Sequence, residues 1–219
     1  AQSITGAILS KLVDPATDVP YYLNIYGDYR GRMEGNLHIN RKFSPNAQSG
    51  IYLHASRHSG FRDHNNDGFY DDARATRLNA MIRNHYSSKN WEGQLNFQAL
   101  RDKRNGGQTI LENPYLSSQT IDHFNISSKI GYLGFNNPNK SIGSIWDFSF
   151  STLDGNYGKR FGLNAIEYHA LGQIIFSWTS NGDHHKFDYG PVANLNIATE
   201  TLSDQGTTNK ISYNQITAG

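Results

Sequence analysis

In the segment TRLNAMIRNHYSSKNWEGQLNFQA, Thr76 to Ala99, mainly apolar and mainly polar positions alternate with a period of two. In its second half Trp91, Leu95 and Phe97 are at odd positions, and the even positions between them are polar. Successive side chains of a β-strand point to opposite faces, so this pattern predicts two half-buried strands. The polar stretch SSKN between them predicts a short turn, and the pair is therefore expected to form an antiparallel hairpin.

The same alternation continues along the chain and predicts an all-β protein of about ten antiparallel strands. The expected strands contain Leu23–Ile25, Leu37–Ile39, Ile51–Ala55, Thr76–Tyr86, Trp91–Ala99, Phe124–Tyr132, Ile142–Phe150, Ile166–Trp178, Phe187–Ile197 and Lys210–Thr217. Short turns alternate with longer links, which are expected at about 59–73 and 103–118. Strands that run up and down between short turns and long loops fit an outer-membrane barrel.

Composition limits the alternatives. The chain has 219 residues, a net charge of +1 and no cysteine, so disulfides and thiolate metal sites are excluded and a nucleic-acid partner is not expected. No apolar run reaches the length of a transmembrane helix, and no signal peptide is visible. No nucleophile elbow or nucleophile–base pattern stands out, and we therefore do not expect an enzyme.

Alternating strands fit either a soluble sandwich or a membrane barrel, and the positions of the aromatic residues favour the barrel. Many aromatics lie at the short-turn ends of the strands, and five of them share the apolar parity: Tyr86, Trp91, Tyr132, Trp178 and Phe187. Aromatic rings at one level are typical of the membrane interface, whereas a sandwich buries them in mid-strand. A soluble calcium-binding sandwich lectin remains a further alternative.

The N-terminal run AQSITGAILSKLVDP, Ala1 to Pro15, precedes the first strand and resembles the end of the plug domain of TonB-dependent outer-membrane receptors. In that family a Ser-Ile-Thr-Gly-x-Ile run and a following proline close the plug. The segment Asn24–Ile39 looks like the family's first barrel hairpin. DHNNDGFYDD, followed by RLNAMIRNHY, and LRDKRNGGQ are similar to a Bacteroidota-type branch.

The resemblance implies two parts, the end of a plug with its linker at residues 1–17 and the first portion of a transmembrane β-barrel at residues 18–219. Such receptors have roughly 22 strands, so the chain is expected to be a segment of a larger barrel. The alternative is a stand-alone outer-membrane barrel of about ten strands with a structural or adhesion role.

The resemblance further implies uptake of a scarce solute, namely a metal chelate such as a siderophore, haem or cobalamin. It places the protein in the bacterial outer membrane, surrounded by lipid. It implies the TonB complex as a partner, through a segment absent from this chain, and allows for a surface lipoprotein.

DHNNDGFYDD is a candidate calcium loop. Side-chain oxygens would come from Asp63, Asn65, Asp67 and Asp71, with Asp72 as a further donor; the carbonyl of Phe69 would face inward, and Gly68 would permit the sharp turn. The helix–loop–helix context of an EF-hand is missing. The alternative is an exposed loop in which Asn, Asp and Gly act as turn formers.

Two further groups are candidates for binding. Arg101, Lys103 and Arg104 would form a basic lip that attracts an anionic chelate, or they simply end a strand that leads into a loop. Polar-parity residues on two of the predicted strands are expected to face the lumen and contact the plug: Glu92, Gln94, Asn96 and His123.

Overall fold

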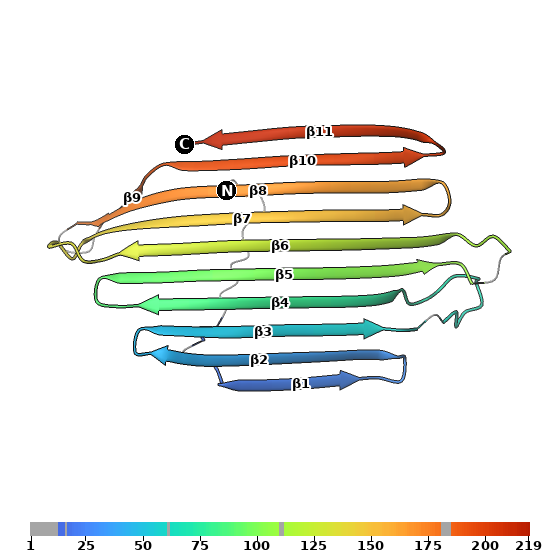
Figure 1. Ribbon diagram of the computed structural model, residues 1–219, viewed down its shortest axis with the longest axis horizontal. Coiled ribbons are helices and arrows are strands. Elements are labelled where there is room, and N and C mark those ends of the chain that lie inside the picture. Colours follow the sequence, from blue (N-terminus) through green and yellow to red (C-terminus); the bar gives the residue numbers. More distant parts are fainter. Residues whose placement is uncertain (1–12, 16, 61, 110–111, 181–184) are drawn as a thin grey trace.

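The computed structural model describes residues 13–15, 17–60, 62–109, 112–180 and 185–219. In these residues the chain forms one antiparallel sheet in which each long strand pairs with the next one along the chain (Figure 1). The strands are β1 Tyr21–Gly27, β2 Arg32–Ser44, β3 Ala47–His58, β4 Arg74–Ser87, β5 Trp91–Gly107, β6 Leu116–Tyr132, β7 Lys140–Tyr157, β8 Phe161–Thr179, β9 Lys186–Tyr189, β10 Val192–Asp204 and β11 Thr207–Ala218. Among the described residues, no helix is long and apolar enough to cross a membrane.

The all-β prediction is confirmed, and its register follows the sequence pattern. Leu78 pairs with Arg101 and Ile82 with Phe97, so the even-numbered, apolar positions of β4 share a face with the odd-numbered, apolar positions of β5. A sandwich requires two packed sheets, whereas the described strands form a single sheet.

The two faces of the sheet differ in side-chain chemistry. One, which we call the apolar face, carries Leu53, Leu78, Leu95 and Phe124, all at least 38% exposed. In the described part of the chain the buried residues without a polar side chain are Pro15, Gly50, Gly155 and Ala198, so the sheet encloses no core. An all-β protein that leaves this much apolar surface exposed needs an apolar environment outside itself.

The strands are longer than the side-chain pattern predicts. Gly107 pairs with Leu116, so the link expected at 103–118 is partly strand, and the pairing of Tyr157 with Phe161 likewise extends β7 and β8 beyond the expected Phe150 and Ile166. Backbone hydrogen bonds do not depend on side-chain polarity, which explains why strands continue after the alternation fades.

The strand expected over Phe187–Ile197 is divided into β9 and β10 at Gly190 and Pro191. Tyr189 pairs with Phe176 and Val192 with Gln173, so both pieces keep the same register on β8. Gly190 has a φ of 153°, and a Cβ there would clash with the carbonyl oxygen of Ile174. Pro191 has no backbone N–H to donate, so the interruption follows from these two residues.

The two ends of the sheet differ. We call the end with links 59–73 and 108–115 the loop end, and the opposite end, with links 45–46, 88–90 and 133–139, the turn end (Figure 1). Aromatic rings gather at the turn end, where Trp91 and Tyr132 have centroids 4.8 Å apart and Trp178 and Phe187 have centroids 5.4 Å apart. At the edges of the described sheet, β1 pairs only with β2, and β11 pairs only with β10.

Candidate functional site

The second face, which we call the polar face, holds the segment that precedes β1. Oδ1 of Asp14 accepts a hydrogen bond from Nε2 of Gln48 at 2.8 Å, and its Oδ2 lies 3.3 Å from Nδ1 of His85. Arg83 donates to the carbonyl of Val13. These contacts attach the segment to β3 and β4 by polar groups.

A second attachment lies on β2. Nδ2 of Asn40 donates to Oδ2 of Asp18 at 3.0 Å and to the carbonyl of Val19 at 2.8 Å. Oδ1 of the same amide accepts the hydroxyl of Tyr52 at 2.8 Å. Asn40 is only 7% exposed, so its amide is buried with its hydrogen-bonding groups paired, as a buried polar side chain requires.

Three of the residues predicted to face a plug lie near this segment, and the fourth lies apart. Gln94 and Asn96 line a small cavity of about 70 Å³ together with Asp14 and Pro15. The carboxylate of Glu92 is 3.8 Å from Nε2 of His85. His123 instead hydrogen-bonds Ser151 at 2.7 Å. The role of all four toward a plug stays a prediction, and residues Ser3 to Ile8 of the plug-like motif lie outside the described residues.

At the loop end, the polar face opens into a pocket of about 400 Å³, which we call the arginine pocket. Its charged lining comes from the β1–β2 turn, β2, β3, β4, β5 and the 59–73 link, and includes Arg30, Arg32, Arg57, Arg77, Arg104, Asp28, Asp72 and Asp102. Arginine presents several donors in a planar fork that matches carboxylate and phosphate groups, so the pocket is suited to an anionic ligand.

Asp102 organises one side of the pocket. Its Oδ2 accepts hydrogen bonds from Nη2 of Arg77 at 2.5 Å and from Nη2 of Arg104 at 3.0 Å. The carboxylate side chain is 8% exposed, whereas the two arginine side chains are 44% and 55% exposed. The nearly buried carboxylate therefore holds both guanidinium groups in place, and part of each guanidinium group stays exposed to the pocket.

Asp28 stabilises the turn at the opposite side of the pocket. Its Oδ1 accepts backbone hydrogen bonds from Arg30 at 2.9 Å and Arg32 at 3.1 Å. These amides, the one of Arg32 above all, lower the pKa of Asp28 from its usual value. The aspartate thus stays ionised while it holds the turn that carries Arg30.

The structure does not bring the three basic residues of the 101–104 stretch onto one face. Arg104 faces the arginine pocket beside Asp102. Arg101 and Lys103 have the parity of Leu95 and Phe97, and Arg101 lines a groove of the apolar face with Leu78 and Phe124. Arg77, which binds the same carboxylate of Asp102 as Arg104 does, was not predicted from the sequence. Arg77 and Asp102 both have the polar parity of their strands, and that pattern was a usable signal.

The candidate calcium loop is held by its own hydrogen bonds. Asp63 accepts the backbone N–H of Asp67 at 3.1 Å and of Gly68 at 2.9 Å, and Asp71 accepts the N–H of His64 at 2.6 Å. Gly68 has a φ of 85°, which favours glycine. Asp67 accepts the N–H of Phe69 at 2.8 Å and the side-chain amide of Asn65 at 2.9 Å, so these residues form a turn network.

This loop is also joined to the link between β5 and β6. Phe69 pairs with Gln108 in an isolated bridge, and the hydroxyl of Thr109 donates to Asp63 at 3.3 Å. Asp72 lines the arginine pocket. In the described parts of the chain no three His, Asp or Glu side chains form a group that could hold a metal, and the calcium assignment stays a prediction.

Comparisons with known proteins give one structural match. No protein-family model matches the chain, and no curated protein matches it. The crystal structure of the ferric yersiniabactin uptake receptor FyuA from Yersinia pestis matches with a TM-score of 0.61 at 11% sequence identity, covering 85% of this chain. The chain spans 34% of the length of that receptor. The likeness shows a shared fold, so the sheet has the architecture of part of an outer-membrane receptor barrel.

Proposed function

We propose that this chain forms part of the barrel wall of a bacterial outer-membrane receptor that takes up a scarce solute. The observation that carries the proposal is the division of one open sheet into two faces. The apolar face is exposed along its length, as a lipid-facing wall is, and the polar face holds the segment before β1 and the arginine pocket. The resemblance to TonB-dependent receptors and the fold shared with FyuA support this role.

In this proposal residues 1–17 are the end of a plug and its linker, and the polar contacts of Asp14 attach them to the lumen side of the wall. The unpaired edges of β1 and β11 would be costly in a bilayer, because each unsatisfied backbone group in lipid costs several kcal/mol. We therefore propose that further strands cover both edges and close the barrel. The loop end then faces outward and the turn end faces the periplasm.

The proposed ligand is an anionic metal chelate. Arg30, Arg32 and the outer parts of Arg77 and Arg104 would engage its carboxylate or phenolate oxygens by charge-assisted hydrogen bonds. Asp72 and Ala73 line this pocket, and the segment 62–73 that ends with them would close over the ligand. Release into the periplasm would need rearrangement of the plug, driven through the TonB complex.

The test is binding and uptake by the full-length receptor. Purified receptor is titrated with ferric tris-catecholate, ferric citrate, haemin and cyanocobalamin, and tryptophan fluorescence reports binding. Arg32→Gln and Arg77→Gln should weaken binding of the bound chelate about tenfold each, since a charge-assisted hydrogen bond is worth about 1.5–3 kcal/mol.

Arg160→Gln is the matched control. Arg160 also lies in a link at the loop end, but it pairs with Asp204 at 2.7 Å and does not line the pocket. Its variant should bind as the wild type does. The proposal would be contradicted if none of the four chelates bound, or if Arg160→Gln and Arg77→Gln weakened binding equally.

A further inference from the structure

The apolar face carries a cluster of basic residues near the loop end. Thr76 on β4 pairs with Arg57 on β3 and with Lys103 on β5, and Leu78, two residues along, pairs with Arg101. Arg57, Lys103 and Arg101 therefore share one face across three adjacent strands, and all three are exposed. Because neighbouring strands are about 4.8 Å apart, Arg57 and Lys103 lie about 10 Å apart across Thr76, and one phosphate could contact both side chains.

The charges of this cluster are only partly compensated. Arg101 pairs with Asp122 at 3.4 Å, in an exposed contact of the kind that contributes little. Among the described residues, neither Arg57 nor Lys103 takes part in an ion pair. Arg57 stands at the rim and borders the arginine pocket as well. The cluster therefore has a net positive charge on β3 to β5.

The height of the cluster matches a membrane interface. Ten residues separate Arg101 from Trp91, which lies among the aromatic residues of the turn end. At about 3.3 Å per residue and a tilt of about 40°, this separation is about 25 Å along the membrane normal, the height of the apolar band of an outer-membrane barrel. Trp91 and Arg101 therefore mark opposite borders of the band.

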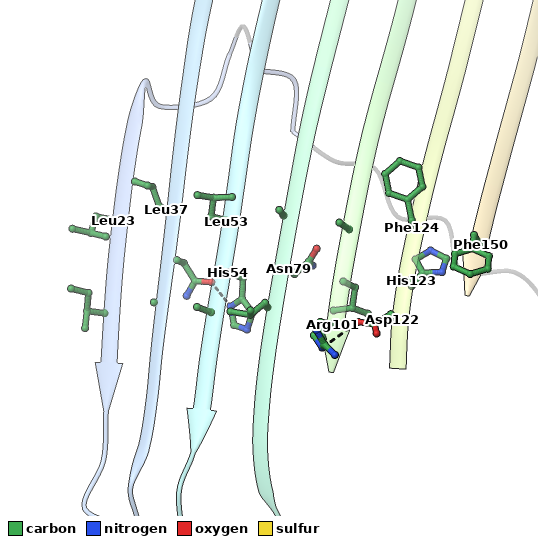
Figure 2. A pocket seen from close by; sticks show the side chains of 18 residues that line it. Leu23, Leu37, Leu53, His54, Asn79, Arg101, Asp122, His123, Phe124 and Phe150 are labelled. Atoms are coloured by element: carbon green, nitrogen blue, oxygen red, sulfur yellow. Dashed lines mark hydrogen bonds and ion pairs between the residues drawn. The ribbon is translucent and has the colours of Figure 1, made fainter. Parts of the chain in front are cut away.

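An apolar groove extends from the cluster toward the middle of the sheet. It has a volume of about 810 Å³ and is lined by Leu53, Leu78, Ala80, Ala99 and Phe124, with Arg101 and Asp122 toward its loop end (Figure 2). Small side chains lie between larger ones there, so the groove is continuous across several strands. A groove with apolar walls and a cationic end is complementary to an acyl chain with an anionic headgroup.

We propose that Arg57, Arg101 and Lys103 bind the phosphate of an anionic membrane lipid, and that the groove beside them holds an acyl chain of the same lipid. The lipid is bound on the outer wall, and of its three basic residues Arg57, at the rim, also borders the arginine pocket. The inference rests on the membrane placement of the proposed function but not on chelate uptake. Arg104, on the opposite face of β5, faces the lumen and does not contact the lipid.

The test is native mass spectrometry of the full-length protein in detergent, titrated with phosphatidylglycerol and, separately, with phosphatidylcholine. The wild type should retain more phosphatidylglycerol than phosphatidylcholine. The Arg101→Gln/Lys103→Gln variant should lose this preference by at least about fivefold, the effect of one basic residue at an anionic lipid surface. Arg104→Gln removes the same charge from the opposite face of β5 and should keep the wild-type preference.

Two results would overturn the proposal: a preference that survives in the double variant, or an equal loss in Arg104→Gln. If the double variant does not fold, Lys103→Gln alone decides, because Lys103 has no ion pair to disrupt among the described residues, and it should show an intermediate loss. Chelate binding is not measured, so failure here and failure of the uptake proposal are distinguishable.

Discussion

Arg77 on β4 donates two hydrogen bonds to one carboxylate oxygen of Asp102 on β5, from Nε at 3.0 Å and from Nη2 at 2.5 Å. The two residues are direct cross-strand partners on the polar face. Nε and Nη2 of Arg104, two residues beyond Asp102, reach Oδ1 and Oδ2 of the same carboxylate. One nearly buried acid thus orders two of the arginines of the arginine pocket.

Asp102→Asn should destabilise the protein and disorder this side of the pocket. The change leaves two guanidinium groups without their anion, and we expect a loss of about 1–2 kcal/mol in the free energy of unfolding. Urea unfolding in lipid vesicles measures it. The control is Asp204→Asn, which breaks an exposed aspartate–arginine pair and should change little. Equal effects of the two variants would contradict the ordering role of Asp102.

Asp28 should make the β1–β2 turn sensitive to acid. Its pKa is lowered in the folded protein, so its contribution to stability is fully present above the ordinary pKa of aspartate and is lost as the pH falls through the lowered value. Asp28→Asn should therefore melt below the wild type at pH 7, and the difference should shrink toward pH 3. A difference that stays constant over this range would show that the carboxylate charge is not involved.

The contact between Arg83 and the carbonyl of Val13 should hold the N-terminal segment against the wall. Arg83→Met removes the donor and keeps an apolar side chain of similar reach. Hydrogen exchange in peptides that cover residues 13–20 should accelerate about tenfold, as expected for loss of one charge-assisted hydrogen bond. Arg41→Met, which alters a cation on the other face of the sheet, should leave this exchange unchanged.

The loop at 63–72 allows two separate tests. The hydrogen bonds of Asp63 require that Asp63→Ala increases proteolytic cleavage of the loop, with or without calcium. The calcium prediction requires a saturable heat in calorimetric titration of the full-length receptor, and Asp67→Ala should remove it. A turn network alone would give the first result and no calcium heat.

Much of the fold could be predicted from the sequence because side-chain alternation and strand register obey the same period of two. Leu78, Ile82, Leu95 and Phe97 lie on one face, as their spacing indicates. The ends of the strands were harder to predict from the sequence, because the pairing of Gly107 with Leu116 depends on backbone hydrogen bonds that leave no side-chain pattern.

The candidate site was harder to predict, because its residues converge only in the folded sheet. Arg30, Arg77 and Arg104 come from three separate segments and meet at one end of the polar face. The RDKR stretch looked like one basic group, yet alternation assigns Arg101 and Lys103 to one face and Arg104 to the other. The same period of two, applied to charged residues as well as apolar ones, would have predicted that Arg104 faces away from Arg101 and Lys103.

Spin labels on β5 test most directly which face of the sheet meets lipid. The chain has no cysteine, so Gln94→Cys, Leu95→Cys, Asn96→Cys and Phe97→Cys each introduce a unique thiol within it for a spin label. In the full-length receptor in bilayers, labels at 95 and 97 should collide with oxygen, and labels at 94 and 96 should collide with a water-soluble nickel chelate. Equal accessibility at all four positions, or the reverse alternation, would contradict the lipid-facing assignment.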